Sequence, residues 1–510
     1  MTTALMIQGT GSHVGKSVLT AALCRIFRED GIAAAPFKPQ NMALNSFVTE
    51  EGHEIGRAQA MQAEAAGLKP HVDMNPILLK PESDKGSQVI IQGKVYGRMM
   101  AAEYHRFKGE AKRFVKESFD RLAAGYKLVV IEGAGSPAEV NLRENDIANM
   151  GTAKMVDAPV ILVGDIDRGG VFAALVGTLE LLEEGERKRV KGFIINKFRG
   201  DVSLLEPGLD FLEEKTGLPV LGVVPMFSGI YVEEEDGVAL DNSVQEAATA
   251  DNVDIVVIRL PRISNFTDFD PLATEESVNL RYINEGEPIG KTDVIILPGT
   301  KNTLADLRYL REAGYDEEIK GHLAGGGFLI GVCGGYQMLG ESISDPQGAE
   351  EGGSMEGLGY LKIKTVMKEE KRTVQVEAAG TNKGALPFEA GSIKGYEIHM
   401  GESFYTGGTK PLFDVTSRNG EAAMTCDGAA SVDGRTWGTY IHGIFDNDEF
   451  RTSFLQSVAK KKGINFGGKG TSSFLERKEE GFKKLADHVR CHVDMDKIYD
   501  IAGLSQDALS

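Results

Sequence analysis

Short apolar runs alternate with helical patterns along the first half of the sequence. The runs occupy residues 4–7, 128–131, 160–163, 192–195 and 220–224, and residues 18–27 form a helical pattern with one apolar face. Runs of this length that alternate with helices are typical of parallel strands covered by helices on both faces. The first half is therefore expected to be an α/β domain built on a parallel sheet.

A second series of apolar runs predicts another α/β domain. These runs lie at residues 255–258, 294–297, 328–332 and 436–442, and the chain after about residue 450 has helical patterns interrupted by a glycine-rich stretch. An acidic run at residues 233–236 separates the two series and is interpreted as part of a solvated linker. The predicted organisation is a first domain at 1–232, a linker at 233–252, a second domain at 253–450 and a helical extension at 451–510.

Charge and cysteine content limit the partners of this chain. Its 510 residues include 75 acidic and 56 basic side chains, for a formal net charge of -19, which argues against nucleic acid or an anionic membrane surface as a general partner. The four cysteines are widely spaced, as expected for reduced thiols in a cytoplasmic protein. We find no signal peptide or membrane-spanning run in the sequence, and its pattern does not indicate an oligomeric state.

The first apolar run leads into a glycine-rich loop followed by a helix, which predicts a phosphate-binding loop for ATP. Backbone N–H groups of such a loop surround phosphate oxygens, and its lysine, here Lys16, reaches the terminal phosphates. Thr10 occupies the position at which the usual motif has its first glycine, so this is a variant loop. The expected ATP-binding residues are Thr10, Gly11, Ser12, His13, Val14, Gly15, Lys16 and Ser17.

A magnesium site is predicted from Ser17 and Glu132. Glu132 follows the apolar run at residues 128–131, and ligands of open α/β sheets bind at the carboxyl ends of the strands. Mg²⁺ prefers carboxylate, hydroxyl, phosphate and water oxygens. We therefore expect ATP to be bound together with Mg²⁺.

Cys333 lies between a buried strand and a helix in the sequence Gly-Val-Cys-Gly-Gly-Tyr-Gln. This is the arrangement of a nucleophile elbow, a strained turn that exposes a nucleophile, with Cys in place of Ser. Glycines beside the cysteine permit such a turn. The N–H group of Gly334 and that of Gly299, which follows another strand, are the predicted oxyanion donors.

The base that serves this thiol should be a histidine elsewhere in the second domain. His442 ends a predicted strand and is the preferred candidate, and His399 is its competitor. Together, Cys333 and His442 are the predicted catalytic pair.

These motifs resemble those of a known family. The second domain is similar to class I glutamine amidotransferases, specifically their CobB/CobQ branch, and the first-domain loop resembles that of dethiobiotin synthetase. The resemblance implies that glutamine supplies ammonia to an ATP-dependent amide ligase in the first domain. Class I relatives usually carry a Glu two residues after the histidine. Ile444 stands there, so the third triad member is absent or comes from a place that the sequence does not indicate.

Three further strings, at residues 37–46, 54–59 and 74–81, resemble members of that branch that act on corrinoids. The resemblance implies amidation of the b, d, e and g side-chain carboxylates of adenosylcobyrinic acid a,c-diamide, a polycarboxylate substrate. The candidate acceptor-side residues are Lys38, Asn41, Asn45, Arg57, Lys80 and Asp146.

Two alternatives remain open from the sequence. A sister enzyme that amidates the a and c carboxylates would share the loop, Glu132, Cys333 and His442. A regulatory or partition ATPase with a decayed amidotransferase module would share the loop, but partition ATPases carry a lysine where this chain has Gly11. A negatively charged protein that binds a polycarboxylate needs a locally basic mouth, with its surplus acid elsewhere, such as at residues 233–236.

Overall fold

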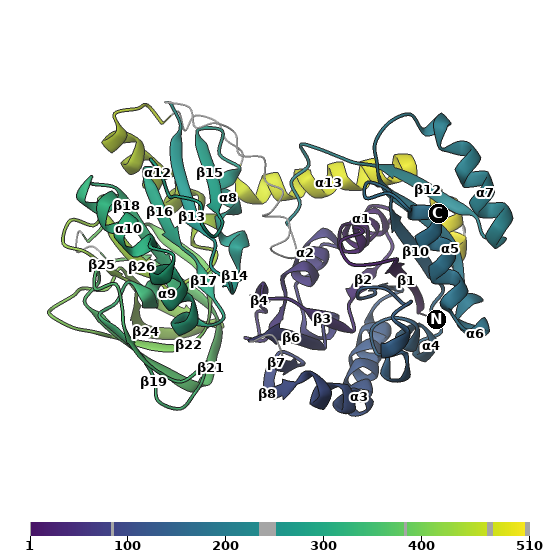
Figure 1. Cartoon of the computed structure of the whole chain (residues 1–510), viewed down its shortest axis with the longest axis horizontal. Helices are drawn as coiled ribbons and strands as arrows, with labels where there is room; N and C mark the ends of the chain where they lie inside the picture. The colour runs from purple at the N-terminus through teal and green to yellow at the C-terminus, as the bar shows by residue number, and fades with distance from the viewer. Residues whose placement is uncertain (1, 83–85, 234–250, 382–384, 467–472, 505–510) are drawn as a thin grey trace.

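The chain forms two α/β halves that lie side by side (Figure 1). The computed structural model describes residues 2–82, 86–233, 251–381, 385–466 and 473–504. The first half contains the phosphate-loop sequence and the second contains Cys333, as the sequence predicts. The predicted domain boundaries stay predictions.

A parallel sheet forms the centre of the first half, which confirms the expected fold class. Both of its faces are buried: Met6 packs into one apolar core, and Leu5 and Ile7 pack into the other. Residues on both faces must therefore be apolar, which explains the continuous apolar runs. In spatial order the strands are β12 (Val220–Pro225), β11 (Val190–Phe198), β10 (Val160–Asp165), β1 (Thr3–Gly9), β9 (Leu128–Glu132) and β2 (Ala34–Phe37).

Two small sheets extend the first half toward the second (Figure 1). One contains β3 (Gln40–Met42), β6 (Ile77–Pro81), β7 (Gly86–Ile91) and β8 (Lys94–Met100). The other pairs β4 (Ser46–Val48) with β5 (Glu54–Gly56). Two of the candidate acceptor-side residues, Asn41 and Lys80, lie on these strands, and Asn45 and Arg57 lie directly beside them in sequence.

The second half has its own largely parallel sheet and a separate, mostly antiparallel one. The first consists of β15 (Val278–Ile283), β13 (Val253–Ile258), β16 (Val294–Leu297), β18 (Phe328–Val332), β26 (Thr436–Thr439) and the antiparallel β25 (Ala429–Ala430). The second contains β20 (Gly353–Glu356), β19 (Ser342–Asp345), β21 (Ile363–Gly380), β22 (Ser392–Tyr405), β23 (Phe413–Arg418) and β24 (Glu421–Asp427). A short pair, β14 (Ile263–Ser264) and β17 (Gly299–Thr300), lies near the thiol. The strand predicted over residues 436–442 ends at Thr439, so His442 lies in the segment beyond it.

Helices cover the sheets of both halves. Those of the first half are α1 (Lys16–Glu29), α2 (Arg57–Ala65), α3 (Ala101–Gly125), α4 (Met150–Met155), α5 (Val171–Leu181), α6 (Glu184–Arg187) and α7 (Glu206–Thr216). Those of the second are α8 (Asp270–Ala273), α9 (Thr303–Glu312), α10 (Tyr315–Ala324), α11 (Gly334–Met338) and α12 (Asp448–Lys462). Among the helices that the structure describes, none has the length and apolar character that crossing a bilayer requires.

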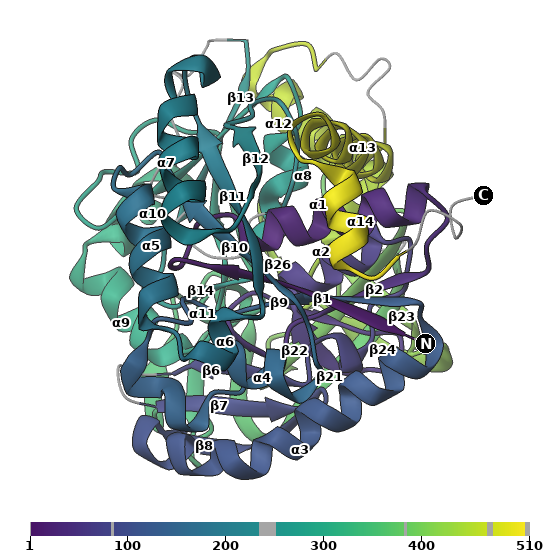
Figure 2. The same ribbon diagram turned by 90° about the vertical axis from the view of Figure 1, so that its right-hand side faces the viewer.

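The C-terminal helices divide between the two cores. Phe450 and Phe454 of α12 belong to the core of the second half. The chain then returns: α13 (Phe474–His492) runs from the second half to the first (Figure 1), and with α14 (Met495–Ile501) it lies beside α1 (Figure 2). Phe482, Leu485 and Val489 of α13 belong to a core of the first half. The nucleotide-binding half is therefore built from both ends of the described chain.

Glu233 corrects the prediction of a solvated acidic linker. Its carboxylate is buried and accepts hydrogen bonds from Arg57 of α2 at 2.8 and 2.7 Å, and it forms an ion pair with Lys478 of α13 at 2.9 Å. Burial alone would raise the pKa of Glu233, but the two cations lower it to about 2. The rest of the predicted acidic run, residues 234–236, lies outside the described residues.

We expect Glu233→Ala to destabilise the protein by about 3–5 kcal/mol, because it leaves two buried cations without their shared carboxylate. The measurement is the shift of the urea unfolding curve followed by circular dichroism. Glu480→Ala is the matched control: Glu480 lies on the exposed face of α13 and pairs with the exposed Lys484, so its loss should change stability by no more than about 0.5 kcal/mol. Equal effects of the two substitutions would contradict the structural role of Glu233.

Candidate active sites

The predicted phosphate loop connects β1 to α1, and contacts with neighbouring strands hold it. The backbone N–H of Thr10 donates to Val163 of β10 at 2.9 Å, and Asn196 of β11 donates to the carbonyl of Val14 at 2.9 Å. Gly15 has a φ of +97°, and a Cβ there would lie 2.1 Å from the Asn196 amide, so only glycine fits. The ammonium of Lys16 binds the carbonyl of Gly11 at 2.7 Å. The loop is thus preshaped with its lysine folded over it.

Glu132 is the polar centre of this edge of the sheet. Its side chain is 1% exposed, and one oxygen accepts from Ser17 at 2.8 Å and from Lys38 at 2.9 Å. The other accepts from Gln62 of α2 at 2.6 Å. A carboxylate beside a hydroxyl at the start of α1 fits the oxygen ligands that Mg²⁺ prefers. The predicted pair, Ser17 and Glu132, is therefore brought together.

The structure separates the candidate acceptor-side residues into groups. Lys38 lies on Glu132, and Asn41 donates to Gln59 of α2 at 2.9 Å, one helical turn from Gln62. Asn45 and Lys80 lie at the contact with the second half. Arg57 belongs to the ion cluster with Glu233. Asp146 accepts hydrogen bonds from three backbone N–H groups at the start of α4, at 2.7 to 2.9 Å, as a capping residue does.

Cys333 occupies a strained turn between β18 and α11, as the elbow motif predicts. Its φ is +52°, which is unusual for a residue other than glycine. Close packing forces this turn: a Cβ on Gly335 would lie 2.0 Å from the carbonyl of Leu297, and one on Gly334 would lie 2.5 Å from Thr300. Gly299 lies against the ring of His442. Both predicted oxyanion donors therefore lie close to the catalytic pair.

His442 has a carboxylate partner that the sequence did not indicate. Its Nδ1 lies 2.6 Å from an oxygen of Asp268, whose other oxygen accepts from the Gly443 N–H at 3.0 Å. Both side chains are almost completely buried. Burial favours the neutral ring, but Asp268 and a hydrogen bond with Cys333 outweigh it and raise the pKa of His442 to about 10. Cys333, His442 and Asp268 thus form a triad-like arrangement.

His399, the competing candidate, is oriented differently. Its Nδ1 bonds the Gly401 carbonyl at 2.7 Å, its ring stacks on Tyr440, and Glu397 lies 3.6 Å from its other nitrogen. Burial lowers the pKa of His399. His399 lines the same cavity as Cys333. To act as the base for the thiol, however, its ring would have to leave these contacts.

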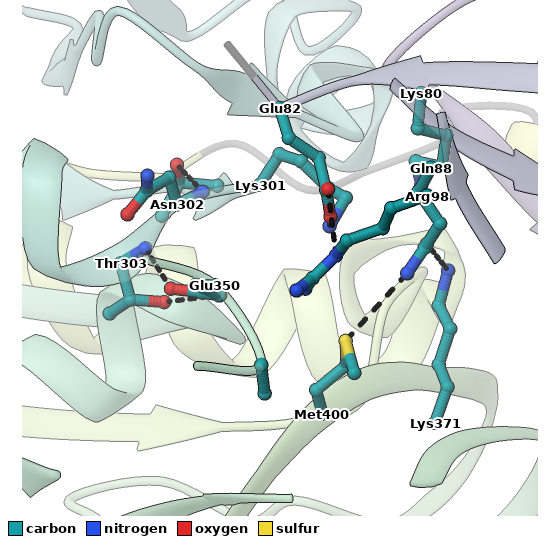
Figure 3. A network of polar contacts seen from close by, with 12 residues as sticks. Lys80, Glu82, Gln88, Arg98, Lys301, Asn302, Thr303, Glu350, Lys371 and Met400 are labelled. Atoms are coloured by element: carbon teal, nitrogen blue, oxygen red, sulfur yellow. Dashed lines mark hydrogen bonds and ion pairs between the residues drawn. The ribbon is translucent and has the colours of Figure 1, made fainter. Parts of the chain in front are cut away.

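The thiol opens into a small cavity between the halves. The cavity has a volume of about 40 Å³, and its lining includes Cys333 and His442 from the second half and Lys80 from the first. Figure 3 shows the contacts around it. Lys301 pairs with Glu82 at 2.7 Å across the contact between the halves, and Thr303 donates its N–H to Glu350 at 2.6 Å. The site in this arrangement has room only for a few water-sized molecules.

Three functional residues were missed at the sequence level. Asn196 follows an apolar run, so its place at the end of a parallel strand could have been noticed. Gln62 and Asp268 gave no such signal, because each reaches its partner through tertiary structure: Asp268 is 174 residues from His442 in sequence.

Comparisons with known proteins agree with this geometry. Residues 5–239 match the CobQ/CobB/MinD/ParA nucleotide binding domain, and residues 254–450 match the CobB/CobQ-like glutamine amidotransferase domain. The chain is 54% identical over 501 residues to a cobyric acid synthase of Thermoanaerobacter sp. (strain X514), covering 98% of each chain. It is 53% identical to that of Caldanaerobacter subterraneus subsp. tengcongensis and 50% identical to that of Syntrophobacter fumaroxidans, again covering 98% of each chain.

We expect Asp268→Asn to slow glutamine hydrolysis between about 10²- and 10⁴-fold, because the ring loses the carboxylate that orients it and stabilises its protonated form. The alkaline limb of the pH–rate profile should also move to lower pH, since the pKa of His442 falls when Asp268 is removed. Asp270→Asn is the control, because Asp270 bonds Tyr231 and not the imidazole. An unmoved pH profile in Asp268→Asn would contradict the assignment.

Proposed function

This chain belongs to the cobyric acid synthase family and is a glutamine-dependent amide ligase of cobalamin biosynthesis, and from that premise we propose its reaction in detail. It amidates the b, d, e and g side-chain carboxylates of adenosylcobyrinic acid a,c-diamide to give adenosylcobyric acid. The observation that carries the proposal is that Lys80 of the nucleotide-binding half lines the same cavity as Cys333, so the half that would hold the acceptor closes the cavity in which ammonia would be released.

The thiol half supplies ammonia. The Cys333 thiol passes its proton to His442 as its sulfur attacks the side-chain amide carbon of glutamine, and the oxyanion that forms is stabilised by N–H groups of Gly334 and Gly299. His442, held by Asp268, gives a proton to the leaving nitrogen, and the C–N bond breaks to release ammonia and a thioester. Water, deprotonated by His442, then releases glutamate and restores the thiol.

The nucleotide half activates the acceptor. A corrinoid carboxylate attacks the terminal phosphorus of ATP, giving an acyl phosphate and ADP, and ammonia then displaces phosphate to form the amide. Lys16 offsets the charge of the transferred phosphoryl group. Lys38, whose ammonium contacts Glu132, is the second cation that does so. Ser17 and Glu132 would hold Mg²⁺, which neutralises phosphate charge when bound. Asn41, Asn45 and Lys80 complete the proposed acceptor side.

The sister reaction, amidation of the a and c carboxylates, is the remaining alternative. Incubation with the a,c-diamide, ATP and glutamine, followed by mass spectrometry over time, separates the two. Our proposal expects stepwise formation of species with up to four added amides. Absence of product from the a,c-diamide, with turnover of the unamidated precursor, would establish the alternative.

Paired variants should separate the two half-reactions. Cys333→Ala should abolish amide synthesis from glutamine but retain synthesis from added ammonia, because only the nitrogen source is lost. Lys16→Ala should lose amide synthesis from both sources yet still hydrolyse glutamine. The measurements are amide and glutamate formation with each nitrogen source. Ammonia-dependent synthesis in Lys16→Ala, or glutamine-dependent synthesis in Cys333→Ala, would disprove the corresponding assignment.

Glu350 is the proposed partner of the α-ammonium group of glutamine. It lines the cavity with Cys333, and burial raises its pKa to about 7, so a substrate cation would stabilise its charged form. We expect Glu350→Gln to reduce the preference for glutamine over glutaramate, which lacks the α-amino group, by about 10-fold or more in kcat/KM. The neighbouring Glu351→Gln, which loses a pair with Arg308, should keep the preference. An unchanged preference in Glu350→Gln would contradict the proposal.

A further inference from the structure

A row of buried polar side chains crosses the first half, and apart from Asn41 and Lys80 its members have no part in the mechanism described so far. It begins at the thiol cavity and ends at Glu132. None of its polar side chains is more than 4% exposed, although polar side chains at such positions cost free energy unless they are hydrogen-bonded. We call this row the polar seam; its members are Lys80, Glu54, Ser46, Gly56, Asn41, Gln59 and Gln62.

The seam starts at the cavity that contains Cys333. The ammonium of Lys80, which lines this cavity, lies 2.8 Å from Ser46 and 2.8 Å from Glu54. Lys371 of the second half binds the other oxygen of Glu54, and Figure 3 shows Lys371 reaching toward Gln88 of the first half. One buried carboxylate therefore joins cations from both halves at the mouth of the seam.

The middle of the polar seam lies at Gly56. Ser46 and Gly56 are partners in the β4–β5 pair, so the two positions are neighbours. A Cβ on Gly56 would lie 2.5 Å from the Gln59 oxygen and 2.6 Å from the Asn41 nitrogen. The missing side chain thus leaves the space in which these two amides meet, at 2.9 Å.

The far end of the polar seam lies at Glu132, where phosphoryl transfer is proposed to occur. Gln59 and Gln62 lie one turn apart on α2, and Gln62 donates to Glu132 at 2.6 Å. Within the described residues, Gln59 Nε2 and Gln62 Oε1 are buried without a hydrogen-bond partner. One is a donor and the other an acceptor, and buried groups of this kind are normally satisfied. A small guest that both accepts and donates hydrogen bonds would satisfy them.

We propose that the polar seam is the route along which ammonia released at Cys333 reaches the acyl phosphate beside Glu132. The inference rests on the proposed function. Ammonia has one lone pair and three N–H bonds, so it can move between the unpaired amide groups. The exclusion of bulk water keeps it from escaping or taking a proton.

The charges at the thiol end of the polar seam favour neutral ammonia over the ammonium ion. Burial and the nearby Lys80 and Lys301 lower the pKa of Lys371 to about 7, despite its contact with Glu54. An ammonium ion in the same surroundings would be disfavoured for the same reasons, desolvation and like charge. Ammonia that leaves the thiol cavity would therefore remain a nucleophile.

The test narrows the seam at Gly56 without touching either reacting centre. Gly56 has a φ of −63° and a ψ of 140°, which other residues adopt readily, and the atoms that a new Cβ would meet are the ends of flexible side chains. Gly56→Ala and Gly56→Val should form glutamate and, with added ammonia, amide at wild-type rates. With glutamine as nitrogen source, the ratio of glutamate to amide should rise several-fold, more in Val than in Ala.

An isotope measurement makes the test independent of rates. Glutamine labelled with nitrogen-15 in its side-chain amide is supplied together with unlabelled ammonium. The wild type should transfer the label undiluted, and the Gly56 variants should form product diluted by solvent ammonium. Gly208→Ala in α7 is the control, because it adds the same methyl group 2.5 Å from the ring of Phe172 in α5, and it should leave both readouts unchanged.

The outcomes distinguish the two proposals. An unchanged ratio and undiluted label in both Gly56 variants would overturn the route. A parallel fall of glutamine- and ammonia-dependent synthesis would also overturn it, since Gly56 would then act on the acceptor site. Failure of the wild type to amidate the a,c-diamide from either nitrogen source would instead overturn the proposed function.

Discussion

A carboxylate removed from water must be paired or hydrogen-bonded, because an isolated buried charge costs several kcal/mol. This constraint organises the molecule. Glu132, Glu54, Glu233 and Asp268 are all buried, and each finds its partners in segments distant in sequence. Glu233 joins α2 to α13, Glu54 joins the first half to Lys371 of the second, and Asp268 fixes the ring of His442. None of these carboxylates can be buried at low cost until its partner segment has docked, so the ion clusters tie the assembly of each site to the assembly of the whole fold.

The fold class followed from the sequence because burial on both faces of a parallel sheet leaves continuous apolar runs, and each main run became a strand. The phosphate loop and the Cys333 turn were predictable because their chemistry depends on residues adjacent in sequence. Partners brought together by tertiary structure were not predictable in this way. Asp268 lies in a short turn with no pattern of its own, and Glu233 looked like one acid in a solvated run until Arg57 and Lys478 were seen on either side. A run of acidic residues indicates a solvated segment only where no cation from a distant part of the chain packs against it.

The same pairing changes the electrostatic problem posed by a net charge of -19. Lys38, Arg57 and Lys80 are the basic residues among the candidate acceptor-side residues, but each is already paired with a buried carboxylate. Glutamine faces a related difficulty, since the cavity of about 40 Å³ is far too small for it. The Lys371–Glu54 and Lys301–Glu82 ion pairs join the two halves beside this cavity. Both ion pairs use a carboxylate of the nucleotide-binding half, so the charged groups around the thiol cavity belong to both halves.

The return of α13 and α14 to the first half makes the second half an insertion within the first. A ribosome synthesises the nucleotide-binding sheet early, but Phe482, Leu485 and Val489, which cover one of its faces, are made only after the whole amidotransferase domain. Until then the apolar face that contains Leu5 and Ile7 lacks the part of its cover that α13 provides, and the ion cluster of Arg57 and Glu233 lacks Lys478. The order of synthesis thus makes the packing of the nucleotide-binding half depend on helices that are made after the whole amidotransferase domain.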